Sequence, residues 1–332
     1  MLERLLNDRV TSLFLVTLGV VLLIGGFAPG FLSPATAASV WTSAMVLLCV
    51  ALGLLPVLLM RQIDVSGGSV IGLSAVVLGL TLQAGLSLPL AILSALGAGM
   101  AAGLLNGLLV TGLGVPAIVA TLGTLGLFRG IMLIATGGEW IENLPASLKA
   151  LAAKGALGLS PLAFVVLAMI VLLWLTLNSR RGRWFRAVGD NRQAAHHLGL
   201  PVRRLELAGF VFAGFMSALA GIIFAAQIGF IPNQAGTGIE LRAIAALVLG
   251  GVSLLGGVGR VAGAVIGVLF LTAIDTALIF LRIPAYWNDF VGGALLLSVL
   301  LLDGRLRLAL ERRDRAARYR HTAAAIRNEV SK

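Results

Sequence analysis

Charged side chains are scarce in this chain of 332 residues, which is 59% hydrophobic and only 12% charged. So few charges cannot cover the surface of a soluble globule. The sequence therefore predicts an integral membrane protein. The formal net charge of +11 does not indicate nucleic-acid binding, because the basic residues gather at the ends of apolar segments and in the C-terminal tail, with few aromatic residues beside them.

Reactive side chains are also few. Cys49 is the single cysteine and lies in an apolar run, which excludes a disulfide framework. The three histidines, at 196, 197 and 321, have neither the spacing of metal ligands nor that of a nucleophile and its base. None of the three lysines belongs to a phosphate-binding loop, so ATP hydrolysis by that route is excluded. We expect no catalytic, cofactor or metal site, and hence no enzyme.

What the chain does contain is a series of apolar runs separated by polar residues, glycine or proline. A membrane-spanning helix needs about 20 apolar residues. By this criterion the sequence predicts about ten spans, at 11–31, 40–60, 67–85, 88–111, 116–135, 161–178, 206–228, 239–257, 260–281 and 287–302. The predicted fold is all-α, a polytopic membrane domain over 1–302 followed by a basic tail over 303–332.

The longest polar interruption, 179–206, holds seven arginines. Arginine and lysine accumulate on the cytoplasmic side of membrane proteins. The side of this loop carries 20 basic residues in the ten-span arrangement and the opposite side carries four. We therefore expect the loop, the tail and both termini to be cytoplasmic, and the loop 136–160 to be external.

A short helix is predicted within the arginine-rich loop, over 189–198. Asp190 or Asn191 can cap its first amides, and Gly199 followed by Pro201 ends it. A helix this short is marginal alone in water. It must pack on its own membrane domain or in a groove of a partner, which makes it a candidate docking element.

A second short helix is predicted in the external loop, where Leu144, Leu148 and Leu151 recur at helical spacing. Such a helix could receive an external partner, or it could simply cover the ends of the spans. The sequence leaves both interpretations open.

Two glycine-rich segments, 63–69 and 249–260, each follow one apolar run and precede another. Interrupted segments in corresponding positions are typical of transporters with two related halves and broken or re-entrant helices. The alternative is that these glycines allow close helix packing or a tight turn. On the first interpretation Asp64, Ser66, Gly256 and Gly257 are gating or turn residues, although Asp64 could also be an ordinary helix cap.

Ionisable residues inside the apolar runs are few, and such residues are functional candidates. Asp275 is the clearest, as a relay or as an interhelical lock paired with a basic or hydroxyl group. Arg129 is another, whereas Glu240 and Arg242 are expected near an outer span end.

Several motifs resemble those of the membrane permeases of bacterial ABC sugar importers of the ribose type, within the branched-chain amino acid/ribose permease superfamily. They are Ile-Asp-Val-Ser at 63–66, the run 116–126 with Arg-Gly at 129–130, and Ala-Val-Gly-Asp-Asn at 187–191. The most specific stretches are 227–234, 282–290 and 303–307. The resemblance covers nearly the whole chain. One departure is Gly67, where the family usually has valine, and it loosens the turn after Ser66.

The resemblance implies partners and a solute. The partners are two cytoplasmic ATPase subunits, a periplasmic binding protein and a second permease, related in a heterodimer or identical in a homodimer, all at the inner membrane. The solute is small and sugar-like, with autoinducer-2 as the first candidate and rhamnose or another monosaccharide next.

The resemblance also implies that the docking helix sits in a groove of the ATPase. We assign coupling to Arg186, Gly189, Asp190, Asn191, Ala194, Ala195 and Gly199, and the solute path to Thr121, Thr124, Gln227 and Asn233. The competing hypotheses are an autonomous ion-coupled secondary transporter and a membrane enzyme acting on lipid.

Overall fold

The computed structural model describes residues 9–297, except 29, 156–157, 285–286, 289 and 295–296. Within these residues the chain is helical, and its one β-bridge joins Ile141 to Ile231. The all-α prediction is confirmed. The helices are α2 (Arg9–Phe27), α3 (Pro34–Leu59), α4 (Gly67–Gln83), α5 (Leu88–Thr111), α6 (Ala117–Thr136), α7 (Ala146–Ala152), α8 (Pro161–Asn178), α9 (Gly182–Asp190), α10 (Arg192–His197), α11 (Val202–Ile228), α12 (Ile239–Leu249) and α13 (Val261–Phe280).

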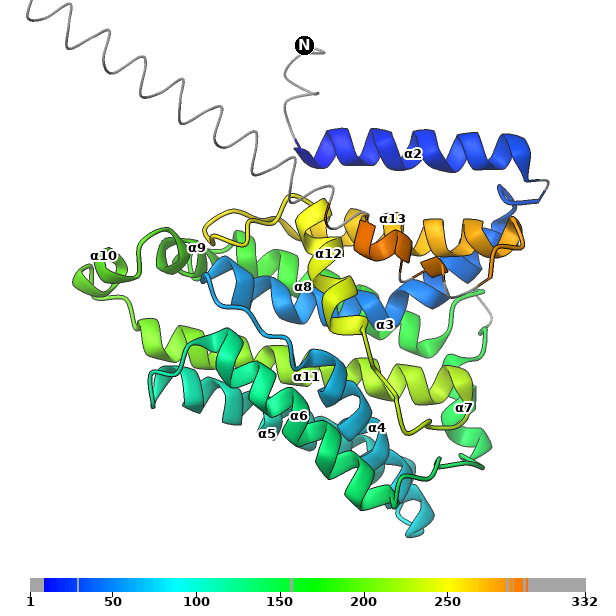
Figure 1. Cartoon of the computed structure of the whole chain (residues 1–332), viewed down its shortest axis with the longest axis horizontal. Helices are drawn as coiled ribbons and strands as arrows, with labels where there is room; N and C mark the ends of the chain where they lie inside the picture. Colours follow the sequence, from blue (N-terminus) through cyan, green and yellow to red (C-terminus); the bar gives the residue numbers. More distant parts are fainter. Residues whose placement is uncertain are drawn as a thin grey trace, which may run out of the picture.

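The long helices run between two opposite ends of the molecule (Figure 1). Helices α9 and α10 lie at one end and α7 at the other. Among the described residues, α3, α5, α6, α8, α11 and α13 are long and apolar enough to cross a membrane, while α2 and α4 offer shorter apolar stretches. This arrangement is that of a polytopic membrane domain.

The core forms around α3 and α11. Most of α3 is apolar and buried, including Met45, Leu48 and Leu52. Glycines bring α5 and α11 close together: a Cβ on Gly103 would lie 2.3 Å from the carbonyl oxygen of Phe210. In lipid the hydrophobic effect between helices is weak, so the contact between these two helices is stabilised mainly by the dense van der Waals packing that the close approach allows.

The predicted span over 239–257 is wrong. Helix α12 has only 11 residues, about 16 Å at 1.5 Å per residue, which is roughly half the thickness of a bilayer core. The rest of the crossing is a non-helical segment, 229–238, which leads from the end of α11 to the middle of the bundle (Figure 1). Helix α4 likewise begins in the middle, after the non-helical segment 62–66.

Smaller corrections concern boundaries. Helix α3 begins six residues before its predicted span, and α11 begins at Val202, so Glu206 belongs to a helix rather than to the arginine-rich loop. The predicted span 287–302 and the tail 303–332 lie largely or wholly outside the described residues.

Helix α7 corresponds to the helix predicted in the loop 136–160. Leu148 of α7, and Leu144 just before this helix, are buried in the main core.

Candidate functional site

Helices α9 and α10 are separated at Asn191, whose backbone is extended with φ −155°. The Asn191 side-chain oxygen accepts a hydrogen bond from the Ala194 amide at 2.9 Å. Gly199, at φ +78°, ends the turn after α10 in the left-handed region that favours glycine. Asn191 rather than Asp190 is therefore the cap, and the predicted helix over 189–198 is wrong as one piece because this cap breaks it.

Glu206 of α11 holds α10 against the membrane domain. Its side chain is fully buried and pairs with Arg192 through Nε–Oε1 at 2.9 Å and Nη2–Oε2 at 3.0 Å. Gln62 donates a further hydrogen bond to Oε1 at 3.2 Å. The hydrogen bond to Glu206 raises the pKa of Arg192, and the two-bond geometry fixes the orientation of the guanidinium group. One carboxylate thus joins α10, α11 and the segment after α3.

Gly189 lies at a close junction of three backbones. A Cβ at this position would lie 1.8 Å from the Leu59 carbonyl oxygen and 2.6 Å from the Gly257 nitrogen. The Gly257 amide donates a hydrogen bond of 2.9 Å to the same Leu59 carbonyl. Gly256 and Gly257 have φ +83° and +73°. We call this contact of Leu59, Gly189, Gly256 and Gly257 the glycine joint.

Gly256 and Gly257 lie in a turn, which is one of the two interpretations that the sequence left open for the segment 249–260, and the backbone of α9 approaches this turn closely. Gly250 instead lies against the Gly263 carbonyl of α13. A second non-helical segment inside the bundle, comparable to 62–66, lies at 229–238.

Arg186 faces inward. Its guanidinium group donates hydrogen bonds to the carbonyls of Leu177 at 3.0 Å and Gly259 at 3.5 Å. It therefore ties the end of α8 to the residues before α13. Of the predicted coupling residues, Arg186 and Gly189 stabilise the base of the loop.

The outer surface of α10 is exposed. Ala195 is buried against Met60 and Val188, but Ala194 is exposed and the Leu198 side chain is 80% exposed. An apolar side chain that projects from a helix anchored at its base is suited to insertion into a groove of another protein.

A buried chain of hydrogen bonds begins at Asp64. The amide and hydroxyl of Ser66 donate to Asp64 Oδ1 at 2.8 and 2.7 Å, Asn106 donates to Ser66 Oγ at 2.7 Å, and Thr124 donates to Asn106 Oδ1 at 2.6 Å. Thr121 accepts the Val65 amide at 3.2 Å. In a helix the amides of residues 62–66 would bond to backbone carbonyls. Here side-chain oxygens accept the amides of Val65 and Ser66 instead.

The N-termini of α4 and α12 meet inside the bundle. A Cβ on Gly68, the second residue of α4, would lie 1.9 Å from Glu240 Oε2 and 2.4 Å from the Gly236 carbonyl oxygen. Glu240, the second residue of α12, is 9% exposed, and its Oε1 accepts the Gly238 amide at 3.3 Å. A carboxylate stabilises a helix N-terminus because the helix dipole is positive there. We call this meeting point the half-helix centre.

Two groups at the half-helix centre are unusual for a membrane interior. Glu240 Oε2 is buried and accepts no hydrogen bond from the described residues. Arg129 of α6 donates to the Ala235 carbonyl at 3.4 Å and to the Thr237 hydroxyl. The expectation that Glu240 lies near an outer span end is wrong, because the non-helical segment 229–238 carries the start of α12 inward.

The four residues assigned to the solute path do not form one cluster. Thr121 and Thr124 are buried in the Asp64 network. Gln227 donates to the Thr42 carbonyl at 2.8 Å, and Asn233 donates to the Gly138 carbonyl at 2.9 Å. In this conformation all four make hydrogen bonds within the chain.

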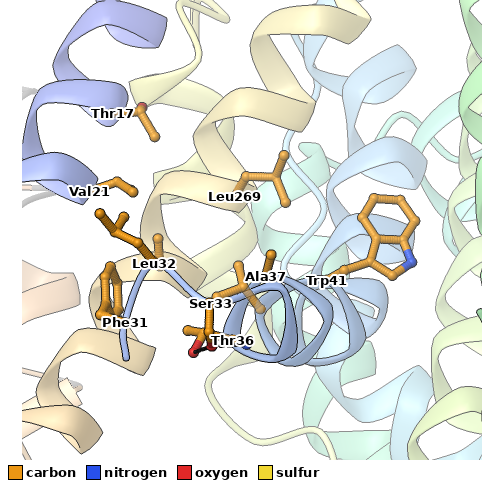
Figure 2. A pocket seen from close by; sticks show the side chains of 11 residues that line it. Thr17, Val21, Phe31, Leu32, Ser33, Thr36, Ala37, Trp41 and Leu269 are labelled. Atoms are coloured by element: carbon orange, nitrogen blue, oxygen red, sulfur yellow. Dashed lines mark hydrogen bonds between the residues drawn. The ribbon is translucent and has the colours of Figure 1, made fainter. Parts of the chain in front are cut away.

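Asp275 pairs with Arg242 between α13 and α12, as the lock hypothesis expects. The pair lines a cavity of about 190 Å³ together with Ser43, Thr272 and Thr276. A larger cavity of about 420 Å³ lies between α2, α3 and α13 (Figure 2). Its lining, which includes Val21, Phe31 and Leu269, is mainly apolar and gives a polar solute few partners.

Sequence reasoning missed Asn106 and Glu206. Asn106 is the one amide residue in the apolar run 88–111, and a polar side chain at such a position has to find a partner. Glu206 follows Arg203 and Arg204, where an acidic residue is inconspicuous. Glu206 pairs with Arg192, which lies 14 positions earlier in the sequence, and only the folded chain brings the two side chains together.

A helical membrane domain whose helices are interrupted in its interior is typical of a membrane permease. Residues 36–300 match the family described as branched-chain amino acid transport system / permease component, and the chain belongs to this family.

Individual relatives are similar over almost the whole chain. It is 51% identical to the autoinducer 2 import system permease protein LsrC of Enterobacter sp. (strain 638), over 96% of this chain and 93% of that protein. The identity is also 51% to the LsrC proteins of Salmonella typhi and Escherichia coli (strain K12 / DH10B), over 96% of this chain and 92% and 94% of theirs. No solved structure matches the chain.

Proposed function

We propose that the chain is the permease subunit of an ATP-driven importer for autoinducer-2 or a closely similar small polyhydroxylated solute. The carrying observation is the anchored docking element: α10 is fixed at its base by Glu206 and the glycine joint, and it presents Leu198 to a partner. The identity of 51% to LsrC proteins over 96% of the chain supports the solute.

In this proposal the chain supplies the path and partners supply the energy. Two ATPase subunits bind the α9–α10 end on the cytoplasmic side, and a periplasmic binding protein delivers the solute at the α7 end. A second permease, most simply a related chain, completes the path. Both termini are cytoplasmic, as the 20 basic residues on that side favour.

Reconstitution in liposomes tests this assignment. With the ATPase, the second permease and the binding protein present, uptake of autoinducer-2 should require ATP. Uptake driven by an ion gradient without the ATPase would instead show a secondary transporter. An external position of an introduced cysteine at Leu198, measured by labelling intact cells, would contradict the orientation.

The docking element has its own test. Replacement of residues 189–197 by a flexible linker should abolish ATPase association and uptake while membrane insertion persists. Unchanged association would refute the docking assignment.

A further inference from the structure

A polar cavity of about 190 Å³ lies between α3, α12 and α13. On α12 it is lined by Ile239 and Arg242, which belong to the first turn of that helix. On α13 its lining begins at Thr272, in the second half of the helix. On α3 the lining begins at Ser43, far from the end of α3 that enters the glycine joint. The cavity therefore lies between the middle of the bundle and the α7 end (Figure 1).

The two charged groups of this cavity neutralise each other. Asp275 accepts a hydrogen bond from Arg242 Nη2, so the pair carries no net charge and the position of the guanidinium group is fixed. The side chains are 30% and 23% exposed, as expected of an intramembrane pair that faces a cavity. Arg242 Nε is buried and has no acceptor among the described residues. Buried donors without a partner are uncommon in native proteins, so Arg242 keeps hydrogen-bonding capacity for a ligand.

Three hydroxyl groups line the same cavity. Thr272 donates to the Val268 carbonyl and Thr276 donates to the Thr272 carbonyl, both at 2.9 Å and within α13. A hydroxyl group that donates in this way keeps a lone pair that can accept another hydrogen bond. Ser43 of α3 is exposed, and its hydroxyl group can donate or accept. The cavity thus presents donors and acceptors close together, which a molecule with several hydroxyl groups requires.

From these groups we propose that the cavity between α3, α12 and α13 is a subsite for a small, neutral, polyhydroxylated solute. Arg242 donates to an oxygen of the solute, and Ser43 and Thr276 bond to its hydroxyl groups. Asp275 is a positioning residue, because it holds the guanidinium group. This inference rests on the proposed function and names where in the chain the solute binds after it enters from the α7 end.

The size and the charge of the cavity select this class of solute. A volume of about 190 Å³ corresponds to about six water molecules and is below the roughly 300 Å³ at which pockets for drug-sized ligands begin. An anionic solute would have to compete with Asp275 for Arg242, whereas a hydroxyl or carbonyl oxygen can bond to the guanidinium group while the ion pair persists. A neutral solute is therefore preferred over an anion of similar size.

Cysteine labelling can test the site directly. The native Cys49 is fully buried, so a cysteine at the exposed position 43 should be the site in this chain that reacts with N-ethylmaleimide. The two permeases with their ATPase, in nanodiscs and without the binding protein, are labelled with and without autoinducer-2, and mass spectrometry of this chain gives the rate. We expect the solute to slow labelling of Ser43→Cys several-fold. The control is Ser39→Cys, one turn earlier on α3, which is exposed and outside the cavity lining and should be labelled at an unchanged rate.

The variant Thr276→Val tests one contact, because it removes the hydroxyl group and nearly preserves the shape. Added to Ser43→Cys, it should raise the autoinducer-2 concentration that gives half-maximal protection by about two- to ten-fold, as expected for one hydrogen bond. The control is Thr111→Val. Thr111 also donates to a carbonyl of its own helix, that of Gly107 at 2.7 Å, but lies outside the cavity lining, so protection should not change.

The variant Asp275→Asn tests the selection of a neutral solute. With Asp275 in place, ribose 5-phosphate should not protect Ser43→Cys. In Asp275→Asn the charge of Arg242 is no longer neutralised, so ribose 5-phosphate should begin to protect. Cys49 must stay unlabelled in this variant, which shows that the core around α3 is retained.

Several outcomes would overturn the proposal. Unprotected or unreactive Ser43→Cys would contradict an accessible solute site, and equal protection of Ser39→Cys would show a change of the whole helix instead. Protection by ribose 5-phosphate as strong as that by autoinducer-2, with Asp275 in place, would mean an anion site. ATP-driven uptake in liposomes is measured separately. Uptake that persists without any protection of Ser43→Cys would reject this subsite and leave the transport assignment standing, whereas protection without ATP-driven uptake would contradict the transport assignment alone.

Discussion

The pair of Glu206 and Arg192 makes α10 a testable structural unit. Replacing Glu206 by glutamine removes the buried charge and at least one of the two bonds to Arg192. Hydrogen bonds to charged groups contribute about 1.5–3 kcal/mol each when buried. The Arg192 side chain is 57% exposed, and solvent screening reduces this to about 1–2 kcal/mol for the pair.

A loss of about 1–2 kcal/mol should raise local opening of α10 by roughly 5- to 30-fold. Hydrogen exchange measures this opening at the amides of Ala195, Leu198 and Leu200, which donate to carbonyls within 191–195. These amides should exchange faster by that factor in Glu206→Gln. Amides in the middle of α11 should not change, because they do not depend on α10.

The matched control is Glu142→Gln, which removes an exposed carboxylate from the α7 end and should leave α10 exchange unaltered. A double-mutant cycle with Arg192→Ala should show coupling between the two positions, since both changes remove the same bonds. Exchange at Ala195 and Leu200 equal to that of the unaltered protein would refute the anchoring role of Glu206.

Three further predictions concern the glycine joint and the interior. Gly189→Ala should reduce ATPase association and uptake, because the new Cβ would overlap the Leu59 carbonyl and destabilise this contact by about 1–3 kcal/mol. The control is Gly97→Ala, whose Cβ would meet open space. It should have no effect in the same pull-down and uptake assays. Asn106→Ala should lower stability by about 2 kcal/mol because Ser66 and Thr124 each lose a hydrogen-bond partner. In thermal unfolding, the loss of stability in the double variant with Thr124→Val should be smaller than the sum of the two single losses. Fully additive losses would argue against the network. Glu240→Gln should leave stability unchanged or raise it, because the change relieves the cost of burying a carboxylate whose Oε2 accepts no hydrogen bond from the described residues, and a thermal unfolding temperature clearly below that of Glu139→Gln would contradict this reasoning.

The sequence predicted the membrane class, most span positions and a short helix in the arginine-rich loop, because these depend on local composition. Apolar runs such as 88–111 and 161–178 coincide with α5 and α8. Asn191 and Gly199 act through their own and neighbouring backbone, so a cap and a stop could be recognised from residue type alone.

The half-helix centre could not be predicted in this way. The segment 63–69 could be recognised as a candidate break, but the segment 229–238 was not recognised as one, and both non-helical segments are stabilised by residues distant in sequence. Asn106 stabilises Ser66 across 40 residues, and Glu240 meets Gly68. Such contacts follow from the three-dimensional arrangement, which local patterns do not contain.

The shortness of α12 has a mechanical consequence. One end of this helix leads toward the glycine joint and the other carries Glu240 beside α4, so it is a stiff rod of about 16 Å that ends in the middle of the bundle. If the end of α12 near the glycine joint tilts, the opposite end of α12 moves as well, at the place where the N-termini of α4 and α12 meet. The non-helical segment 229–238, on the far side of Glu240, has no helix to transmit that tilt further along the chain.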